Sequence, residues 1–253
     1  MTYRKIFQIA CIIAPCAVFA QRTAYYTHPN ASLEKAINLY HQKQYKASQY
    51  LLLQQLQQVS DASTQEACKY YIASAAIHLG QTGANDQMEQ YLKEYPASPY
   101  ATNAYLQIGD YYFTKGDTKR AIAWYDKVHI GALSASEKEK FSFQYGYALF
   151  AHGDKETAQQ YLSEVQHSKT YGKKAAYYLG YIAYDADDYQ KANEFFQQVG
   201  EEKELNKNLS YYQADMNFKQ GNFQKSLEEG LAQLKKATQP QYRTEINKII
   251  GES

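Results

Sequence analysis

The sequence has little that could build a β-sheet. No segment alternates apolar and polar residues as a half-buried strand does. Proline is scarce, with five in 253 residues, and four of them separate long helical patterns: Pro29, Pro96, Pro99 and Pro240. The pattern therefore predicts an all-α protein.

Cysteine and net charge are also scarce. Cys11 and Cys16 lie in an apolar N-terminal stretch, so Cys68 is the one thiol in the rest of the chain and no internal disulfide can form there. We interpret Cys68 as a buried helical residue rather than a reactive thiol. The 27 basic and 26 acidic residues nearly cancel, which disfavours nucleic acid or an anionic membrane as a partner.

Catalytic and metal-binding signatures are missing from the sequence. It contains no glycine-rich phosphate loop, no HExxH pair, no nucleophile elbow and no spaced cysteine set. Asp185, Asp187 and Asp188 cluster, but the glycine and distal glutamate of a calcium loop do not follow them, and a turn between helices explains them better. The sequence predicts no enzyme, no cofactor and no metal.

Residues 1–20 have the composition of an export signal. Two basic residues precede an apolar run that ends in Val18-Phe19-Ala20, with small residues one and three places before the expected cut. We expect cleavage after Ala20, a linker over 21–30 and no membrane span in the mature chain. This predicts an exported protein that is periplasmic or associated with the outer membrane.

Two other interpretations of this N-terminal stretch are weaker. A retained anchor would need a longer apolar run, and Pro15 would disturb its helix. A lipid on Cys16 would need a different residue before the cysteine, because Pro15 fits a lipid-attachment site badly.

A repeated pattern organises the rest of the chain. Within ATNAYLQIGDYYFTKGDTKRAIAWYDKV, Gly109 is followed at plus seven by Gly116, at plus twelve by Ala121 and at plus sixteen by Tyr125. This segment resembles the tetratricopeptide repeat. In that family the small residue lets helix A approach helix B, the glycine forms the turn, and the ring fills the gap to the next repeat.

The same register recurs along the chain. Gly146 is followed by Gly153 and Ala158, and Gly180 by Ala192 and Phe196. We place the small residue of each helix A at Ala36, Ala76, Gly109, Gly146, Gly180 and Ala214. The spacings of 40, 33, 37, 34 and 34 residues cluster near the period of about 34 expected for the family.

The resemblance implies a right-handed α-solenoid of helix-turn-helix repeats over 31–253. We expect about six repeats and, from Pro240, the first helix of a further repeat that is truncated; a polar capping helix is the alternative. Lys43 in a turn, Met88 at a small position and Gly230 at an aromatic position depart from the family pattern.

The segment Tyr95-Pro96-Ala97-Ser98-Pro99-Tyr100 is similar to the inter-repeat segment of periplasmic repeat proteins, such as outer-membrane assembly lipoproteins and the Tol-Pal coordinator family. Pro96 is expected to stop one helix, while Ser98 and Pro99 cap and open the next. The resemblance supports an envelope protein without identifying its partner.

The resemblance also implies a concave wall made by the A helices. Side chains three before, one after and four after each small residue are expected to face it, and most are aromatic. The predicted groove comprises Phe143, Tyr147, Tyr177, Tyr181, Tyr184, Tyr211, Asp215 and Phe218. Tyrosine suits recognition surfaces, but the alternative is that these rings only pack the A helices together.

We therefore expect a non-catalytic scaffold of the cell envelope that binds a peptide or protein along this groove. The lysine and asparagine clamp of the chaperone-binding members is absent from the matching places. A glycan-binding module is an alternative, because aromatic walls also stack sugars and Asn208 and Asp215 lie nearby. A third alternative is the repeat region of a larger envelope protein.

The export hypothesis predicts that the mature protein begins at Gln21, because the cut follows Val18-Phe19-Ala20. Intact-mass spectrometry of protein from periplasmic and membrane fractions measures this directly. An intact Met1 or a lipid on Cys16 would contradict the expectation.

Overall fold

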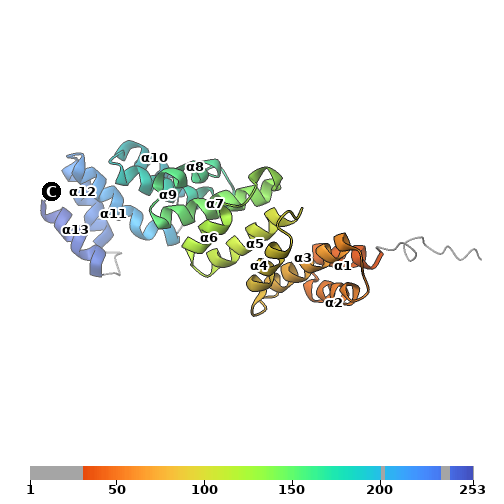
Figure 1. Ribbon diagram of the computed structural model, residues 1–253. Helices are drawn as coiled ribbons and strands as arrows, with labels where there is room; N and C mark the ends of the chain where they lie inside the picture. The colour runs from red at the N-terminus through yellow and green to blue at the C-terminus, as the bar shows by residue number, and fades with distance from the viewer. Residues whose placement is uncertain (1–30, 201–202, 235–239, 253) are drawn as a thin grey trace, which may run out of the picture.

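The computed structural model describes residues 31–200, 203–234 and 240–252, and the expected signal peptide and linker lie outside this part. Figure 1 shows an elongated stack of helices with α1 and α13 at opposite ends. Apart from the short 3₁₀ helix η2 (Ile130–Ala132), the elements are α1 (Ala31–His41), α2 (Tyr45–Leu56), α3 (Ala62–His78), α4 (Ala84–Glu94), α5 (Ala101–Thr114), α6 (Thr118–Tyr125), α7 (Ala135–His152), α8 (Lys155–Glu164), α9 (Gly172–Asp185), α10 (Tyr189–Val199), α11 (Lys203–Lys219), α12 (Phe223–Leu234) and α13 (Pro240–Glu252).

The helices form six antiparallel pairs followed by α13. We call α1, α3, α5, α7, α9 and α11 the A helices. Their partners are the B helices: α2, α4, α6, α8, α10 and α12. Each B helix packs against the A helices before and after it, and successive A helices also touch. Successive B helices of the described chain have at most marginal contact. The A side is therefore the tighter, concave side of the stack.

Aspartate and serine caps start many of the helices. Asp117, Asp154 and Asp188 each accept a hydrogen bond from the backbone N–H three residues later, at the start of α6, α8 and α10. Ser134 and Glu137 form a capping box at the start of α7. The aspartates at 187 and 188 thus belong to a turn and a cap.

Every A helix ends in the same left-handed turn. In α5, Gly116 N–H donates to the Phe113 carbonyl at 3.0 Å and Asp117 N–H to the Tyr112 carbonyl at 3.0 Å, which is a Schellman cap. The residues with positive φ at this place are Lys43, Gly80, Gly116, Gly153, Asp187 and Gly221. Lys43 and Asp187 adopt φ of 61° and 58°, where glycine would be less strained.

This turn corrects the register expected for the second repeat. The matching cap bonds run from Gly80 N–H to the Ile77 carbonyl and from Gln81 N–H to the Ala76 carbonyl. Ala76 therefore occupies the place of Tyr112, and Ala73 is the counterpart of Gly109. The turn over 79–83 is longer than in the other repeats because Gly83 caps α4, so spacing counted back from Gly83 places the small residue three positions too late. With Ala73, the spacings become 37, 36, 37, 34 and 34 residues.

The small residues lie where helices A and B touch most closely. A Cβ at Gly109 would overlap the Tyr125 ring, and one at Gly180 would overlap the Phe196 ring. At Gly146 an added Cβ would come within 2.9 Å of Leu162 Cγ. The facing small residues of the B helices are fully buried: Ala121, Ala158 and Ala192.

The departures from the repeat pattern have local explanations. Met88 is fully buried and shares a core cluster with Ala73 and Leu92. Gly230 is also buried, and a Cβ there would lie 3.1 Å from Ile250 of α13. Glycine thus lets α13 pack closely on α12. Cys68 is fully buried in α3, where burial raises its thiol pKa to about 11.

None of the helices over 31–200, 203–234 and 240–252 combines the length and apolar character needed to cross a bilayer.

Gly180→Ala should lower the free energy of unfolding by about 1–3 kcal/mol, because the methyl group overlaps the Phe196 ring. Gly251→Ala is the matched control. It is also helical, and no described atom lies within 4 Å of its added Cβ, so better helix propensity should leave stability unchanged or raised by less than about 1 kcal/mol. Urea unfolding followed by circular dichroism compares them. Equal effects of the two variants would contradict the close approach.

Candidate functional site

A repeated contact joins the A helices along the concave side. In one A helix, the contact is made by the residue four positions after the small residue. In the next A helix, it is made by the residue directly after the small residue. Tyr40 hydrogen-bonds Ser74 at 2.5 Å in this way. The equivalent pairs further along are Phe113 with Tyr147, Phe150 with Tyr181, and Tyr184 with Asp215. These contacts make the wall continuous from one repeat to the next.

From α5 to α11 the wall is an unbroken series of rings, which we call the aromatic ladder. It comprises Phe113, Tyr147, Phe150, Tyr178, Tyr181, Tyr184 and Tyr212, all half-buried. Ring centroids along it lie 5.0 Å apart for Tyr147 and Tyr178, 5.4 Å for Phe150 and Tyr181, and 5.5 Å for Tyr181 and Tyr212. Most pairs meet edge to face or tilted, which is the favoured geometry for aromatic rings.

A carboxylate with two partners lies at the α5 end of the ladder. Asp110 accepts a hydrogen bond from the Tyr125 hydroxyl at 2.9 Å and forms an ion pair with Lys140 Nζ at 2.5 Å. Burial, followed by the nearby Asp110 carboxylate, raises the pKa of Tyr125. The tyrosine therefore remains a neutral donor. Lys140 is the more accessible partner, with 43% of its side chain exposed against 21% for Asp110.

A similar group lies at the α11 end. Asp215 accepts a hydrogen bond from the Tyr184 hydroxyl and lies 3.1 Å from Lys219 Nζ. Lys219 Nζ also lies 4.8 Å from the Tyr184 ring centroid and 5.7 Å from that of Tyr189. Burial, and then the hydrogen bond to Asp215, raise the pKa of Tyr184. The Tyr189 hydroxyl in turn hydrogen-bonds Asp187.

His78 of α3 is influenced by the charges of Asp110 and Lys140. Its ring stacks on Tyr45 at 4.3 Å, and its Nε2 lies 3.1 Å from the Tyr40 hydroxyl. Burial lowers the pKa of His78 most strongly, the charges of Lys140 and Lys43 lower it further, and Asp110 partly offsets them. The ring is therefore neutral near pH 7.

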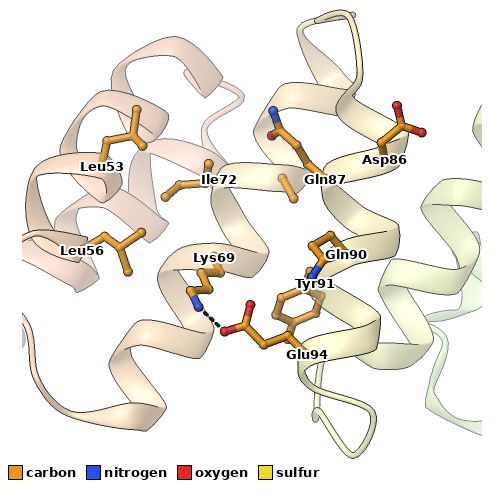
Figure 2. A pocket seen from close by; sticks show the side chains of 10 residues that line it. Leu53, Leu56, Lys69, Ile72, Asp86, Gln87, Gln90, Tyr91 and Glu94 are labelled. Atoms are coloured by element: carbon orange, nitrogen blue, oxygen red, sulfur yellow. Dashed lines mark hydrogen bonds and ion pairs between the residues drawn. The ribbon is translucent and has the colours of Figure 1, made fainter.

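A second surface lies on the opposite side, between α2 and α4 (Figure 2). It is an open pocket of about 440 Å³ with Ile72 and Ala73 of α3 among its lining residues, and we call it the α2–α4 pocket. Leu53, 48% exposed, and Leu56 line it from α2. The pair of Lys69 and Glu94 spans α3 and α4 at its edge, as Figure 2 shows.

Sequence comparison identifies the central part of this wall. Residues 143–202, which run from within α7 to just beyond α10, match the family model of the tetratricopeptide repeat. This match covers about a quarter of the chain. The matched residues include Gly146, Gly153, Ala158 and Gly180, on which the predicted register depends. No curated protein matches the sequence.

Solved structures share this stack of paired helices. MamA from AMB-1 superposes with a TM-score of 0.53 at 17% identity, covering 68% of this chain and 90% of MamA. MamA from MSR-1 gives a TM-score of 0.51 at 16% identity, covering 67% and 93%. At these identities the likeness shows the fold alone, and it confirms the predicted all-α solenoid.

The predicted groove residues fall into three groups. Tyr147, Tyr181 and Tyr184 belong to the aromatic ladder. Tyr177 packs on Tyr178 and Phe196, Tyr211 lies against Tyr212, and Phe218 lies against Phe223. Phe143 and Asp215 are buried, 8% and 9% exposed, and Phe143 stacks on Tyr171 at 4.9 Å. Phe143 therefore belongs to the packed interior of the repeats rather than to an accessible wall.

Sequence reasoning missed Tyr178 and Tyr212, which complete the ladder. Both stand two residues before a small position, at Gly180 and Ala214. Tyr178 lies three residues before Tyr181, and Tyr212 lies three residues before Asp215, so the two residues of each pair lie on one helical face. The same spacing argument would have found them. Lys219 was also missed, four residues after Asp215.

The low pKa of His78 predicts how stability depends on pH. The folded ring binds fewer protons than the unfolded chain, so stability should fall as pH falls through the ordinary histidine value of about 6.5. NMR titration of the ring should give a midpoint below that value, and His78→Gln should remove this part of the pH dependence. A midpoint at or above 6.5 would contradict the burial and charge argument.

Proposed function

We propose that this chain is a non-catalytic scaffold of the cell envelope that holds a peptide or protein partner along the aromatic ladder. The observation that carries the proposal is the unbroken series of half-buried rings across four successive A helices. Rings of this kind offer a large contact area that loses little conformational entropy on binding. Tetratricopeptide repeats over 143–202 are consistent with a partner-binding role.

Packing alone accounts for part of the ladder but not for Tyr181. Within the described chain its hydroxyl has no hydrogen-bond partner, whereas the hydroxyls of Tyr125 and Tyr184 each donate to an aspartate. The Tyr181 ring contacts Phe150 and Tyr212 and remains half-buried. A ring with an available hydroxyl at the middle of a wall is the usual form of a binding hot spot.

The cellular location in this proposal rests on the N-terminal sequence. The basic start and apolar run of residues 1–20 support export. Glycan binding is the second candidate. It requires Asn208 and Asp215 as polar partners beside the rings, but Asp215 is buried and already engaged by Tyr184 and Lys219, and the Asn208 side chain lies outside the described part. The wall therefore favours a peptide.

Tyr181→Ala should weaken binding of the partner by about 2 kcal/mol, or roughly thirtyfold, if the ring is a hot spot. Tyr181→Phe keeps the ring and should lose only the smaller contribution of one hydrogen bond, about 1 kcal/mol. The partner is captured from a cell-envelope extract, identified by mass spectrometry, purified and titrated against each variant. Circular dichroism melting of the same samples reports stability separately.

Leu53→Ala, at the exposed edge of the α2–α4 pocket, is the control on the opposite side. It should leave the affinity unchanged. Full affinity of a well-folded Tyr181→Ala together with a loss in Leu53→Ala would place binding on the other face. Binding of purified oligosaccharides without any protein partner would favour the glycan candidate instead.

A further inference from the structure

The two ends of the aromatic ladder differ in charge. Near α5, Lys140 pairs with Asp110, while Lys43 and Lys140 both lie close enough to His78 to influence its titration. His78 also joins this end to α1 through the hydrogen bond to Tyr40. With His78 neutral, two cations face one carboxylate, and both lysines are accessible, Lys43 in an exposed turn.

Near α11 the balance is reversed. Lys219 pairs with Asp215, and its Nζ lies over the Tyr189 ring, whose hydroxyl binds Asp187. Two carboxylates therefore surround one cation. Asp187 is the exposed carboxylate of the two, because Asp215 is only 9% exposed. This end of the wall offers a negative charge to a ligand.

The left-handed turns that end the A helices form a rim of the wall, and the residues with positive φ in these turns also differ in charge. Lys43 and Asp187 occupy equivalent left-handed turns, seven residues after the small residues Ala36 and Gly180. Between them the same place is filled by glycine at Gly80, Gly116 and Gly153. Gly221 fills the place after α11. The rim thus carries a cation in its first turn, a carboxylate in its fifth and glycine in the three turns between them.

We infer that the ladder binds an extended, aromatic or apolar peptide with an acidic residue toward Lys43 and Lys140 and a basic residue toward Asp187. This deepens the proposed function and rests on it. Asp187 follows α9, two A-helix steps from Asp110 of α5, where Lys140 binds, and four steps from Lys43, which follows α1. At roughly 9 Å a step these separations are about 18 Å and 36 Å. An extended chain rises about 3.3 Å per residue, so the acidic and basic residues should be separated by about five to eleven residues. Complementary charge at the two ends would fix the direction in which the peptide lies.

Lys43 and Asp187 allow an unusually clean test. Both have positive φ, so Lys43→Gly and Asp187→Gly remove one charge each while relieving backbone strain. Neither substitution is expected to unfold the chain. A library of random 12-residue peptides displayed on phage is first selected on the full chain, and the enriched peptides are synthesised. Their affinities are then measured by fluorescence anisotropy.

The enriched peptides should carry an aromatic centre with an acid at one end and a base at the other. Each glycine variant should weaken binding about two- to fivefold, the range typical of an exposed charge pair. Replacing the peptide's acidic residue with glutamine should abolish the effect of Lys43→Gly and spare that of Asp187→Gly, and replacing its basic residue should do the reverse.

The outcomes separate this inference from the proposed function. Peptides that depend on Tyr181 but show no charge pattern, or whose response to Lys43→Gly and Asp187→Gly is not changed by the glutamine replacements, would overturn the polarity and leave the groove intact. No enriched peptide, or peptides indifferent to Tyr181→Ala, would overturn both.

Discussion

The close approach of helix A to helix B at one small residue is the constraint on which the rest of the structure depends. Gly109 and Gly180 leave no room for a Cβ against Tyr125 and Phe196. Because the contact recurs in each repeat, it sets the angle and register of each pair, and each pair then presents the same edge to the next. The concave wall is a consequence of that repetition.

The left-handed turn transmits this register to the polar chemistry. Its left-handed residue lies seven residues after the small position of each A helix. At the start of α6, α8 and α10 the next residues of the turn include the aspartate that caps the B helix. Lysine and aspartate replace glycine there in α1 and α9, at positions where glycine would be less strained. These two exceptions to the repeat are also the charges that distinguish the two ends of the wall.

Much of the fold could be predicted because each repeat carries its own local signals. The glycines at 109, 146 and 180 fixed the helix pairs, and the prolines marked boundaries. The predicted register of the second repeat was wrong because its turn is longer: Gly80 ends the A helix and Gly83 caps the B helix. Spacing alone cannot distinguish these two glycines. At the site, spacing found Tyr147 and Tyr181 but could not tell that Phe143 stacks on Tyr171, since burial depends on the neighbouring repeat.

The proposed function requires that partners bind the A-helix wall rather than the outer face. Hydrogen exchange of the full chain, measured by mass spectrometry with and without its purified partner, distinguishes the two faces. We expect added protection in α5, α7, α9 and α11 and unchanged exchange in α2 and α4. Protection confined to α2, α3 and α4, around the α2–α4 pocket, would contradict the proposed function.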